Sequence, residues 1–397
     1  MRRARLTDAR AATRNLPVAD EAQRASYPSS YPRFASRAKG AYVWDTDGNR
    51  YIDYVLGYGP VILGHADERI TRRVIDEIAH GNTVLPLWSP RQIELTEMLT
   101  ALIPGGELAF LMKTGSEANS AAVRLARVFT GRSKVVRWGY CGWHDWAAED
   151  AAGIPEAVRA DTLTYTYGDL DSLRAAFDEN PEEIACVIMM PFHELRAPAA
   201  HLHEVRDLAH AHGALFVLDE MRSGFRMALG GAQEYMGIRA DLSTFSKAMA
   251  NGYPISAVVG RADVMQGLAT TRISSTFCAG PVEIVAALET LAVLRETDAL
   301  GRIWDRGAAL QLGLQGAINE TGVHAEVVGY PPMPFVRFTH ADPVQRARQR
   351  ERFFVETTRR GMLLHSNHHW FISSSHTEDD IAVTVEACRL AFEIACR

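Results

Sequence analysis

The chain has 397 residues, of which 47% are hydrophobic and 23% charged, and its formal net charge at pH 7 is −6. This composition is typical of a folded globular protein and excludes intrinsic disorder, collagen-like sequence and a coiled coil. The longest apolar run covers residues 184–192, which is too short to span a membrane, and the mild acidity gives no sign of nucleic-acid binding. We expect a soluble, cytoplasmic protein of two or three packed units.

Five cysteines are scattered along the chain, without a C-x-x-C pair or a Cys/His cluster at metal-ligand spacing. This pattern predicts free thiols in a reducing compartment and no metal site. The Arg-rich N-terminus, residues 1–15, includes Asp8 and has no clear apolar face, so we interpret it as a tail rather than as a targeting signal.

The N-terminal part of the chain predicts an arm followed by a hairpin. Residues 1–40 are polar and contain Tyr27-Pro28 and Tyr31-Pro32, a pattern that favours an extended segment. Residues 40–55 then alternate apolar and polar side chains around Asp47-Gly48, which is typical of a β-hairpin.

Helical and strand patterns alternate from residue 90 onward, which predicts a mainly parallel sheet with helices on both faces. We expect helices over 90–102, 116–130, 169–179 and 201–212, and strands over 108–112, 134–138, 184–190 and 214–218. Further strands are expected near 242–245, 256–259, 323–328, 334–339 and 369–373, and further helices over 281–320, 343–360 and from 378 onward. The final part of the chain therefore predicts a smaller α+β domain.

A strand-to-helix turn at residues 113–117 has the features of an anion site. The strand over 108–112 runs into Thr-Gly115-Ser116, and a helix begins at once; Ser116 can cap it and Glu117 complements its positive end. A phosphate placed here would meet free backbone N–H groups, a hydroxyl and the helix dipole together. The alternative is a capped helix with a purely structural role.

A second feature is the apolar strand over 214–218, which ends in Asp219-Glu220. Ligands of open α/β sheets bind at the carboxyl ends of the strands, and a buried aspartate there needs a positive partner. A helix cap or a salt bridge is the structural alternative.

The third feature is a lysine, a residue type that is rare in this chain. The only lysines are Lys39, Lys113, Lys134 and Lys247. Lys247 follows the apolar strand over 242–245, so we expect a desolvated amine with a lowered pKa that is able to form a Schiff base. Lys39 lies in the expected arm, Lys113 at the phosphate-type turn and Lys134 on an exposed turn. An anion site, a carboxylate and an amine at strand ends together meet the needs of pyridoxal phosphate.

With these residues in place, the chain resembles the class III (ω-type) aminotransferases of fold type I, in the branch that contains glutamate-1-semialdehyde aminomutase. The resemblance extends from residue 40 to the C-terminus and rests on residues 40–49, 114–118, 219–226 and Ser246-Lys247. It implies an α/β fold, a mainly parallel seven-stranded sheet in a large domain plus a smaller α+β domain. We expect the arm and hairpin at 1–50 to contribute to the small domain, a large pyridoxal-phosphate domain over 51–285 and the C-terminal small domain over 286–397.

The resemblance also implies catalytic and cofactor-binding residues. Lys247 would carry the cofactor as a Schiff base and move the substrate proton, and Asp219 would pair with the pyridine nitrogen. Gly115 and Ser116 match the phosphate turn.

Three further positions match family contacts to the cofactor. Tyr140 falls where an aromatic ring stacks on one face of the cofactor ring, and Met221 falls where an aliphatic residue packs on the other. Thr276 matches a threonine that reaches the phosphate of the neighbouring subunit, which implies a homodimer with shared active sites.

The chain departs from the family at positions that bear on substrate. Cys141 replaces a common histidine, and Met190-Pro191 replaces a common Glu-Pro. Residues 21–24 do not match the carboxylate anchor of the aminomutases, and residues 364–371 replace a loop that carries a glutamate in those enzymes.

Aromatic and imidazole side chains gather beside Tyr140 and near the C-terminus. Trp143, His144, His368 and His369 are therefore candidate substrate contacts, because amphipathic rings and short polar groups suit a polyhydroxylated ligand. The alternative is that the tryptophans fill the core or a dimer interface.

The resulting hypothesis is a ping-pong aminotransferase. An amino donor, glutamate or glutamine, would supply nitrogen for an aldehyde or ketone of a sugar, cyclitol or aminoglycoside-type intermediate in antibiotic or polysaccharide biosynthesis. The alternatives are glutamate-1-semialdehyde 2,1-aminomutase and a pyridoxal-phosphate-dependent amino-sugar epimerase. A cofactor-binding protein without activity is disfavoured because Lys247, Asp219 and the phosphate turn are all present.

Overall fold

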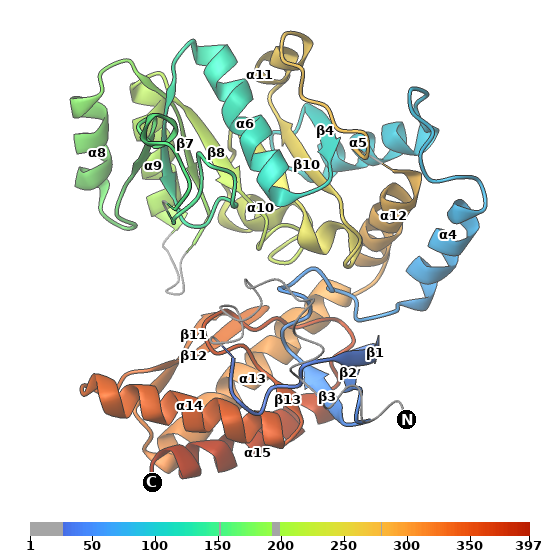
Figure 1. Cartoon of the computed structure of the whole chain (residues 1–397), viewed down its shortest axis with the longest axis vertical. Helices are drawn as coiled ribbons and strands as arrows, with labels where there is room; N and C mark the ends of the chain where they lie inside the picture. The colour runs from blue at the N-terminus through green and yellow to red at the C-terminus, as the bar shows by residue number, and fades with distance from the viewer. Residues whose placement is uncertain (1–26, 151, 193–198, 279) are drawn as a thin grey trace.

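A computed structural model describes residues 27–150, 152–192, 199–278 and 280–397, so residues 1–26 of the expected arm lie outside the described residues. The chain forms two lobes (Figure 1). The larger contains the central sheet and its helices; the smaller combines the N-terminal strands with the C-terminal helices. None of the helices in the described ranges has the length and apolar character that a membrane span requires.

Seven strands form the central sheet, in the order β4 (Leu108–Met112), β10 (Ser256–Gly260), β9 (Leu242–Phe245), β8 (Leu215–Asp219), β7 (Ile184–Met189), β5 (Lys134–Trp138) and β6 (Thr162–Thr164). β10 runs antiparallel to β4 and β9, and every other neighbouring pair is parallel. This confirms the predicted fold class. Because β10 reverses direction between them, β4 and β9 still end at the same edge of the sheet.

Helices cover both faces of this sheet, as the apolar character of its strands predicts. They include α5 (Pro90–Leu102), α6 (Gly115–Thr130), α8 (Leu170–Glu179) and α9 (Ala199–Ala211). Along β7, Val187 and Met189 join the apolar cluster that contains Phe177 of α8, whereas Ile188 joins the cluster that contains Ala122 of α6. Because successive side chains point to opposite faces of a strand, β7 contributes to two separate hydrophobic cores.

The small lobe joins the two ends of the chain in one sheet. β1 (Ala35–Lys39), β2 (Tyr42–Asp45) and β3 (Arg50–Asp53) are antiparallel, which confirms the predicted hairpin, and β13 (Met362–Leu363) adds in parallel to β3. The hairpin of β11 (Ala325–Tyr330) and β12 (Met333–Phe338) packs with α13 (Ala299–Thr321), α14 (Pro343–Arg359) and α15 (Glu378–Ala395).

One predicted helix and one predicted strand are wrong. The helix expected over 281–320 is two helices, α12 (Pro281–Glu296) and α13, because Thr297 is extended and ends the first. The expected domain boundary after residue 285 falls inside α12, which packs against α4 (Glu68–Ile78) and α5.

The strand expected near 369–373 is also absent. Trp370, Phe371 and Ile372 are all fully buried, so the segment lacks the alternation of a half-buried strand. Their backbone N–H groups donate in turn to Pro334, Tyr54 and Pro332, which ties the segment to two different elements and prevents a regular ladder.

One buried arginine connects the large lobe to this segment. Arg226 follows β8, is fully buried, and donates to the backbone carbonyls of Gly59 and, at 2.8 Å, Ile372. Its guanidinium also lies over the ring of Phe371, 5.0 Å from the centroid. Burial lowers the pKa of Arg226 to about 9.

Arg226→Ala should lower the free energy of unfolding by about 2–4 kcal/mol, because it leaves two buried carbonyls without their charged donor. Arg239→Ala, at an exposed position on the same lobe, is the matched control and should change stability by less than about 0.5 kcal/mol. Thermal and denaturant unfolding measure both variants. Equal stability of the two variants would contradict the connecting role of Arg226.

Candidate active site

The three features singled out in the sequence meet in one cavity of about 540 Å³. The turn after β4, the end of β8 and the residue pair after β9 all lie at the carboxyl edge of the sheet, where ligands of open α/β sheets bind. The cavity is lined by Tyr58, Gly115, Ser116, Asn119, Tyr140, Gly142, Met190, Asp219, Met221, Arg222, Ser246, Lys247 and His368.

The start of α6 offers free backbone donors to this cavity. Thr114, rather than the expected Ser116, caps the helix: its hydroxyl accepts from Glu117 N–H, and the Glu117 carboxylate accepts from Thr114 N–H at 2.7 Å. The N–H groups of Gly115 and Ser116 have no hydrogen-bond partner among the described residues. Because such donors and the helix dipole favour an anion, the turn suits a phosphate.

Close packing around Ser116 requires a glycine opposite it. A Cβ at Gly142 would lie 2.4 Å from Ser116 Oγ, and Gly142 has a φ of +107°. Ser116 Oγ accepts from Trp143 N–H at 3.3 Å, which fixes the hydroxyl beside the helix start.

The carboxylate of Asp219 is held by a chain of hydrogen bonds. Asn119 Nδ2 donates to Asp219 Oδ2 at 2.7 Å, and Met221 N–H donates to Oδ1 at 2.9 Å. Asn119 is in turn fixed by Thr244 Oγ1, which donates to its Oδ1 at 2.6 Å, and by the carbonyl of Cys141. Burial raises the pKa of Asp219, and these donors oppose the rise. A cationic N–H in the cavity would complete the neutralisation of this buried charge.

Lys247 supplies the amine. Its side chain is partly buried, and burial lowers the pKa of Lys247 to about 8, with the positive charge of Arg222 as the next cause. A pKa near 8 leaves part of the amine neutral and nucleophilic near physiological pH.

The other lysines are engaged elsewhere. Lys39, Lys113 and Lys134 form ion pairs with Glu68, Glu283 and Glu183, respectively. Lys247 is therefore the lysine whose surroundings suit nucleophilic chemistry, as predicted.

Arg222 and His368 line the cavity together with Tyr58. Arg222 Nη2 donates to the carbonyl of Phe192 at 2.7 Å, and Nη1 lies 3.0 Å from His369 Nδ1. Burial lowers the pKa of His368 to about 4, so its imidazole is neutral at physiological pH. The rings of Tyr58 and His368 meet edge to face at 5.5 Å between centroids.

Four of the predicted site residues lie outside the wall of this cavity. Trp143 is 70% exposed, and His144 Nδ1 lies 2.7 Å from Ser120 Oγ. His369 lies behind the wall, where it contacts the lining residues Arg222 and His368. Thr276 lines a different pocket of the same chain. Tyr140, Met221 and the remaining predicted residues do line the cavity.

Six lining residues were not among the predicted site residues: Tyr58, Asn119, Gly142, Met190, Arg222 and Ser246. Asn119 carried a signal, because it is a polar residue within the Ala-rich stretch of α6, one turn after Ser116. Arg222 lay inside the segment 219–226 but received no role, and Tyr58 belongs to a loop without a recognisable motif. No cluster of three or more His, Cys, Asp or Glu suited to a metal occurs in the part of the chain that the structure describes.

The residues of the cavity fit pyridoxal phosphate. Gly115 and Ser116 would hold its phosphate, Asp219 its ring nitrogen and Lys247 its aldehyde carbon. The fit rests on the chemistry of these donors: free N–H groups at a helix start, a buried carboxylate in need of a cation, and a partly buried amine.

Comparison with known proteins agrees with this geometry. The model of the family "Aminotransferase class-III" matches residues 24–145 and 151–388. The solved structure of the pyridoxal-phosphate internal aldimine form of the FumI protein from Sphingopyxis sp. MTA144 superposes with a TM-score of 0.90 at 33% identity, covering 94% of this chain and 91% of that one.

Relatives with different named activities have similar sequence identity to this chain. A 3-aminobutyryl-CoA aminotransferase from Cloacimonas acidaminovorans is 39% identical, over 91% of this chain and 89% of the relative. A 2'-deamino-2'-hydroxyneamine transaminase from Streptomyces kanamyceticus is 38% identical over 79% of each chain. A glutamate-1-semialdehyde 2,1-aminomutase from Thermomicrobium roseum is 34% identical over 92% of each.

The extent of these matches exceeds the shared sheet and includes both lobes. The protein therefore belongs to the class III aminotransferases, a family of pyridoxal-phosphate-dependent enzymes.

Proposed function

We propose that the enzyme transfers an amino group from glutamate or glutamine to an aldehyde or ketone of a sugar, cyclitol or aminoglycoside-type acceptor. The observation that carries this proposal is the set of neutral polar groups around the catalytic lysine. Tyr58, Tyr140 and the neutral His368 line the cavity, and Asp219 is the sole carboxylate in its wall as the structure describes it. Such groups hydrogen-bond to hydroxyls without demanding a charged substrate.

The named activity of one relative supports the same acceptor class. The transaminase from Streptomyces kanamyceticus is named for a neamine derivative, which is an aminoglycoside-type compound.

A second candidate is amination of a 3-oxoacyl thioester. Arg222 supports it, because a guanidinium in the cavity wall is a donor for a carbonyl or carboxylate oxygen of an acyl compound. The relative from Cloacimonas acidaminovorans, at 39% identity, is named for a 3-amino acyl thioester, the amine that corresponds to such a ketone.

Isomerisation is less well supported than net transfer. Met190 lines the cavity at the position where a carboxylate is common, and His368 occupies the loop that carries a glutamate in the aminomutases. In the proposed reaction, the amino donor and the carbonyl acceptor are therefore two different molecules. The amino-sugar epimerase stays an alternative, since it needs little beyond Lys247.

Each protein group has a defined task in this reaction. Pyridoxal phosphate, when bound, supplies an aldehyde and an electron-withdrawing ring. Lys247 Nζ, with its lowered pKa, accepts and returns the proton of the substrate carbon. Asp219, fixed by Asn119 and Met221 N–H, keeps a proton on the ring nitrogen. Arg222, braced by the carbonyl of Phe192, binds an oxygen of the substrate.

The acceptor class is tested by the absorbance of the holoenzyme while amines are added one at a time. The panel contains glutamate, an aminocyclitol, neamine, 3-aminobutyryl-CoA and 4,5-diaminovalerate. Amination of the cofactor by glutamate and by an aminocyclitol or neamine is the expected result. Conversion by 3-aminobutyryl-CoA instead establishes the second candidate, and conversion by diaminovalerate alone would overturn both in favour of the aminomutase.

The cytoplasmic location stays a prediction.

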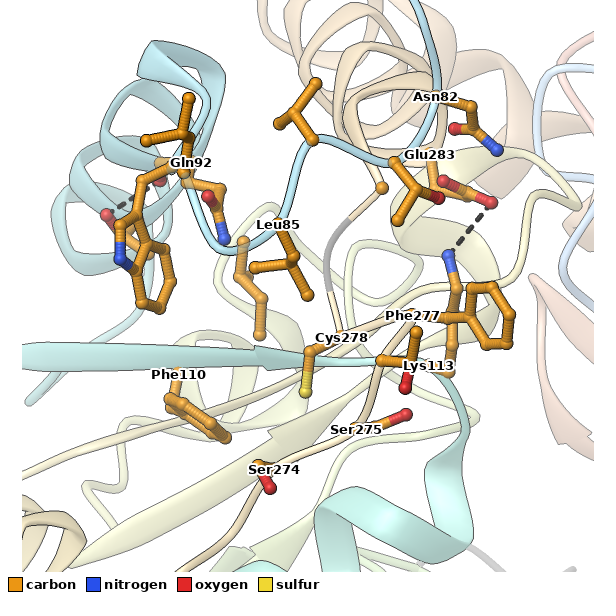
Figure 2. Close-up of a pocket in the computed structure, with 18 of the residues that line it drawn as sticks. Asn82, Leu85, Gln92, Phe110, Lys113, Ser274, Ser275, Phe277, Cys278 and Glu283 are labelled. Carbon is orange, nitrogen blue, oxygen red and sulfur yellow. Dashed lines mark hydrogen bonds and ion pairs between the residues drawn. The ribbon is translucent and has the colours of Figure 1, made fainter.

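We also propose a homodimer with shared active sites. Thr276 lines a pocket of about 500 Å³. Figure 2 shows this pocket, with Gln92 of α5 and Phe277, the neighbour of Thr276, in its wall. Large apolar side chains at this pocket are exposed: Leu87 by 73%, Trp88 by 71% and Phe277 by 61%. An apolar surface of this kind, next to a residue matched to a neighbouring active site, supports a second copy of the chain as its partner.

Trp88→Asp should convert the dimer to a monomer of about 43.9 kDa, because the new charge would be buried without a partner in the interface. Size-exclusion chromatography with light scattering measures the mass. Leu312→Asp, at a side chain 78% exposed on α13, is the matched control and should remain dimeric. A monomeric wild-type enzyme would contradict the proposal.

Arg222→Met should raise the pKa of Lys247, because it removes a positive charge that disfavours the ammonium form. The pH midpoint for covalent capture of pyridoxal phosphate by the apoprotein should therefore move upward from about 8 by roughly one unit. Stopped-flow absorbance across a pH series measures it. Arg222→Lys keeps the charge and should keep the midpoint; an equal shift in both variants would contradict the electrostatic cause.

A further inference from the structure

A second pocket, of about 450 Å³, lies in the small lobe. Its walls come from β12, from the first two turns of α14 and from the loop before His368. The lining residues are Phe335, Val336, Arg337, Phe338, Pro343, Arg346, Ala347, Arg350, Ser366 and Asn367.

The wall carries three arginines and, in the described structure, no Asp or Glu. Arg337 is paired with Glu326, which lies outside the wall, at 2.6 Å. Arg346 and Arg350 form no ion pair with any described residue: Arg350 Nη1 donates to Asn367 Oδ1 at 2.8 Å, and Arg346 Nη1 to the carbonyl of His340 at 3.3 Å. Two exposed guanidinium groups therefore line this pocket without a carboxylate in ion-pair contact among the described residues.

The spacing of these arginines is unfavourable without an anion. Arg346 and Arg350 are four residues apart on α14, so their side chains are neighbours on one face of the helix, where like charges destabilise. An anion between them removes this repulsion. Several guanidinium forks around one pocket match the geometry of phosphate oxygens, which accept two N–H bonds from a single arginine.

The pocket adjoins the catalytic cavity through one short loop. Asn367, in its wall, is followed directly by His368, which lines the cavity. Phe335, also in its wall, has its ring centroid 6.1 Å from that of His369, and His369 contacts Arg222. A ligand in the pocket thus touches the loop that supplies a wall of the catalytic site.

We propose that this pocket binds a phosphate-bearing small molecule, held by Arg346 and Arg350, at a position distinct from that of the cofactor phosphate. The phosphate belongs either to an extended substrate or to a separate ligand that acts on the loop. The site does not depend on the acceptor class proposed above.

Calorimetric titration of the holoenzyme with inorganic pyrophosphate tests the site. The bound cofactor keeps its own phosphate position filled, and constant cofactor absorbance during the titration shows that it stays bound. Arg346→Met and Arg350→Met should each weaken pyrophosphate binding about tenfold, as expected for loss of a charge-assisted hydrogen bond. Arg348→Met, on the same helix but outside the pocket, is the matched control and should bind like the wild type.

The titration measures binding without turnover. Its result therefore does not depend on whether the proposed acceptor is correct. Steady-state kinetics with a donor identified by the amine panel then separate the two sources of the phosphate. A rise in KM at constant kcat assigns the site to an extended substrate, whereas a change in kcat assigns it to a separate ligand. No binding to the wild type at millimolar pyrophosphate, or equal losses in all three variants, would overturn the proposal.

Discussion

The buried carboxylate of Asp219 constrains the whole catalytic edge of the sheet. A charge in that position is stable only with donors around it, and the fold supplies them from three directions. Asn119 comes from α6, the N–H of Met221 from the turn after β8, and Thr244 from β9 holds Asn119 in place. The free N–H groups of α6 and the amine of Lys247 border the same cavity, so the residues that hold this carboxylate lie beside the other groups proposed to bind the cofactor.

The turn after β8 extends this arrangement into the small lobe. Arg222 reaches Phe192 and His369, while Arg226 reaches Gly59 and Ile372. Both guanidiniums also disfavour the ammonium form of Lys247. Two arginines on one turn therefore contact the C-terminal loop and also contribute to the electrostatic surroundings of the amine.

Local sequence patterns predicted the strand ends well because each is an apolar run that stops at a chemically distinctive residue. Lys247 and Asp219 were found in this way, and the structure brings both to one cavity. Ser116 was wrongly expected to cap α6: Thr114 is favoured because Glu117, three residues later, completes a reciprocal pair of bonds.

Other features depend on contacts that no local pattern contains. The roles of Tyr58 and Arg222 arise from packing between distant segments, and the strand expected near 369–373 is lost because its N–H groups serve two different partners. The position of Thr276 gains meaning only with a second copy of the chain, which is why its role stays a prediction.

The central claim is that Lys247 is the amine that binds the cofactor, and the scarcity of lysine makes it directly testable. Borohydride reduction of the holoenzyme, followed by proteolysis and mass spectrometry, locates the cofactor on the chain. The account predicts the added mass on Lys247, its loss in Lys247→Ala, and its retention in Lys113→Arg. Modification of Lys39, Lys113 or Lys134 instead, or an adduct that persists in Lys247→Ala, would contradict it.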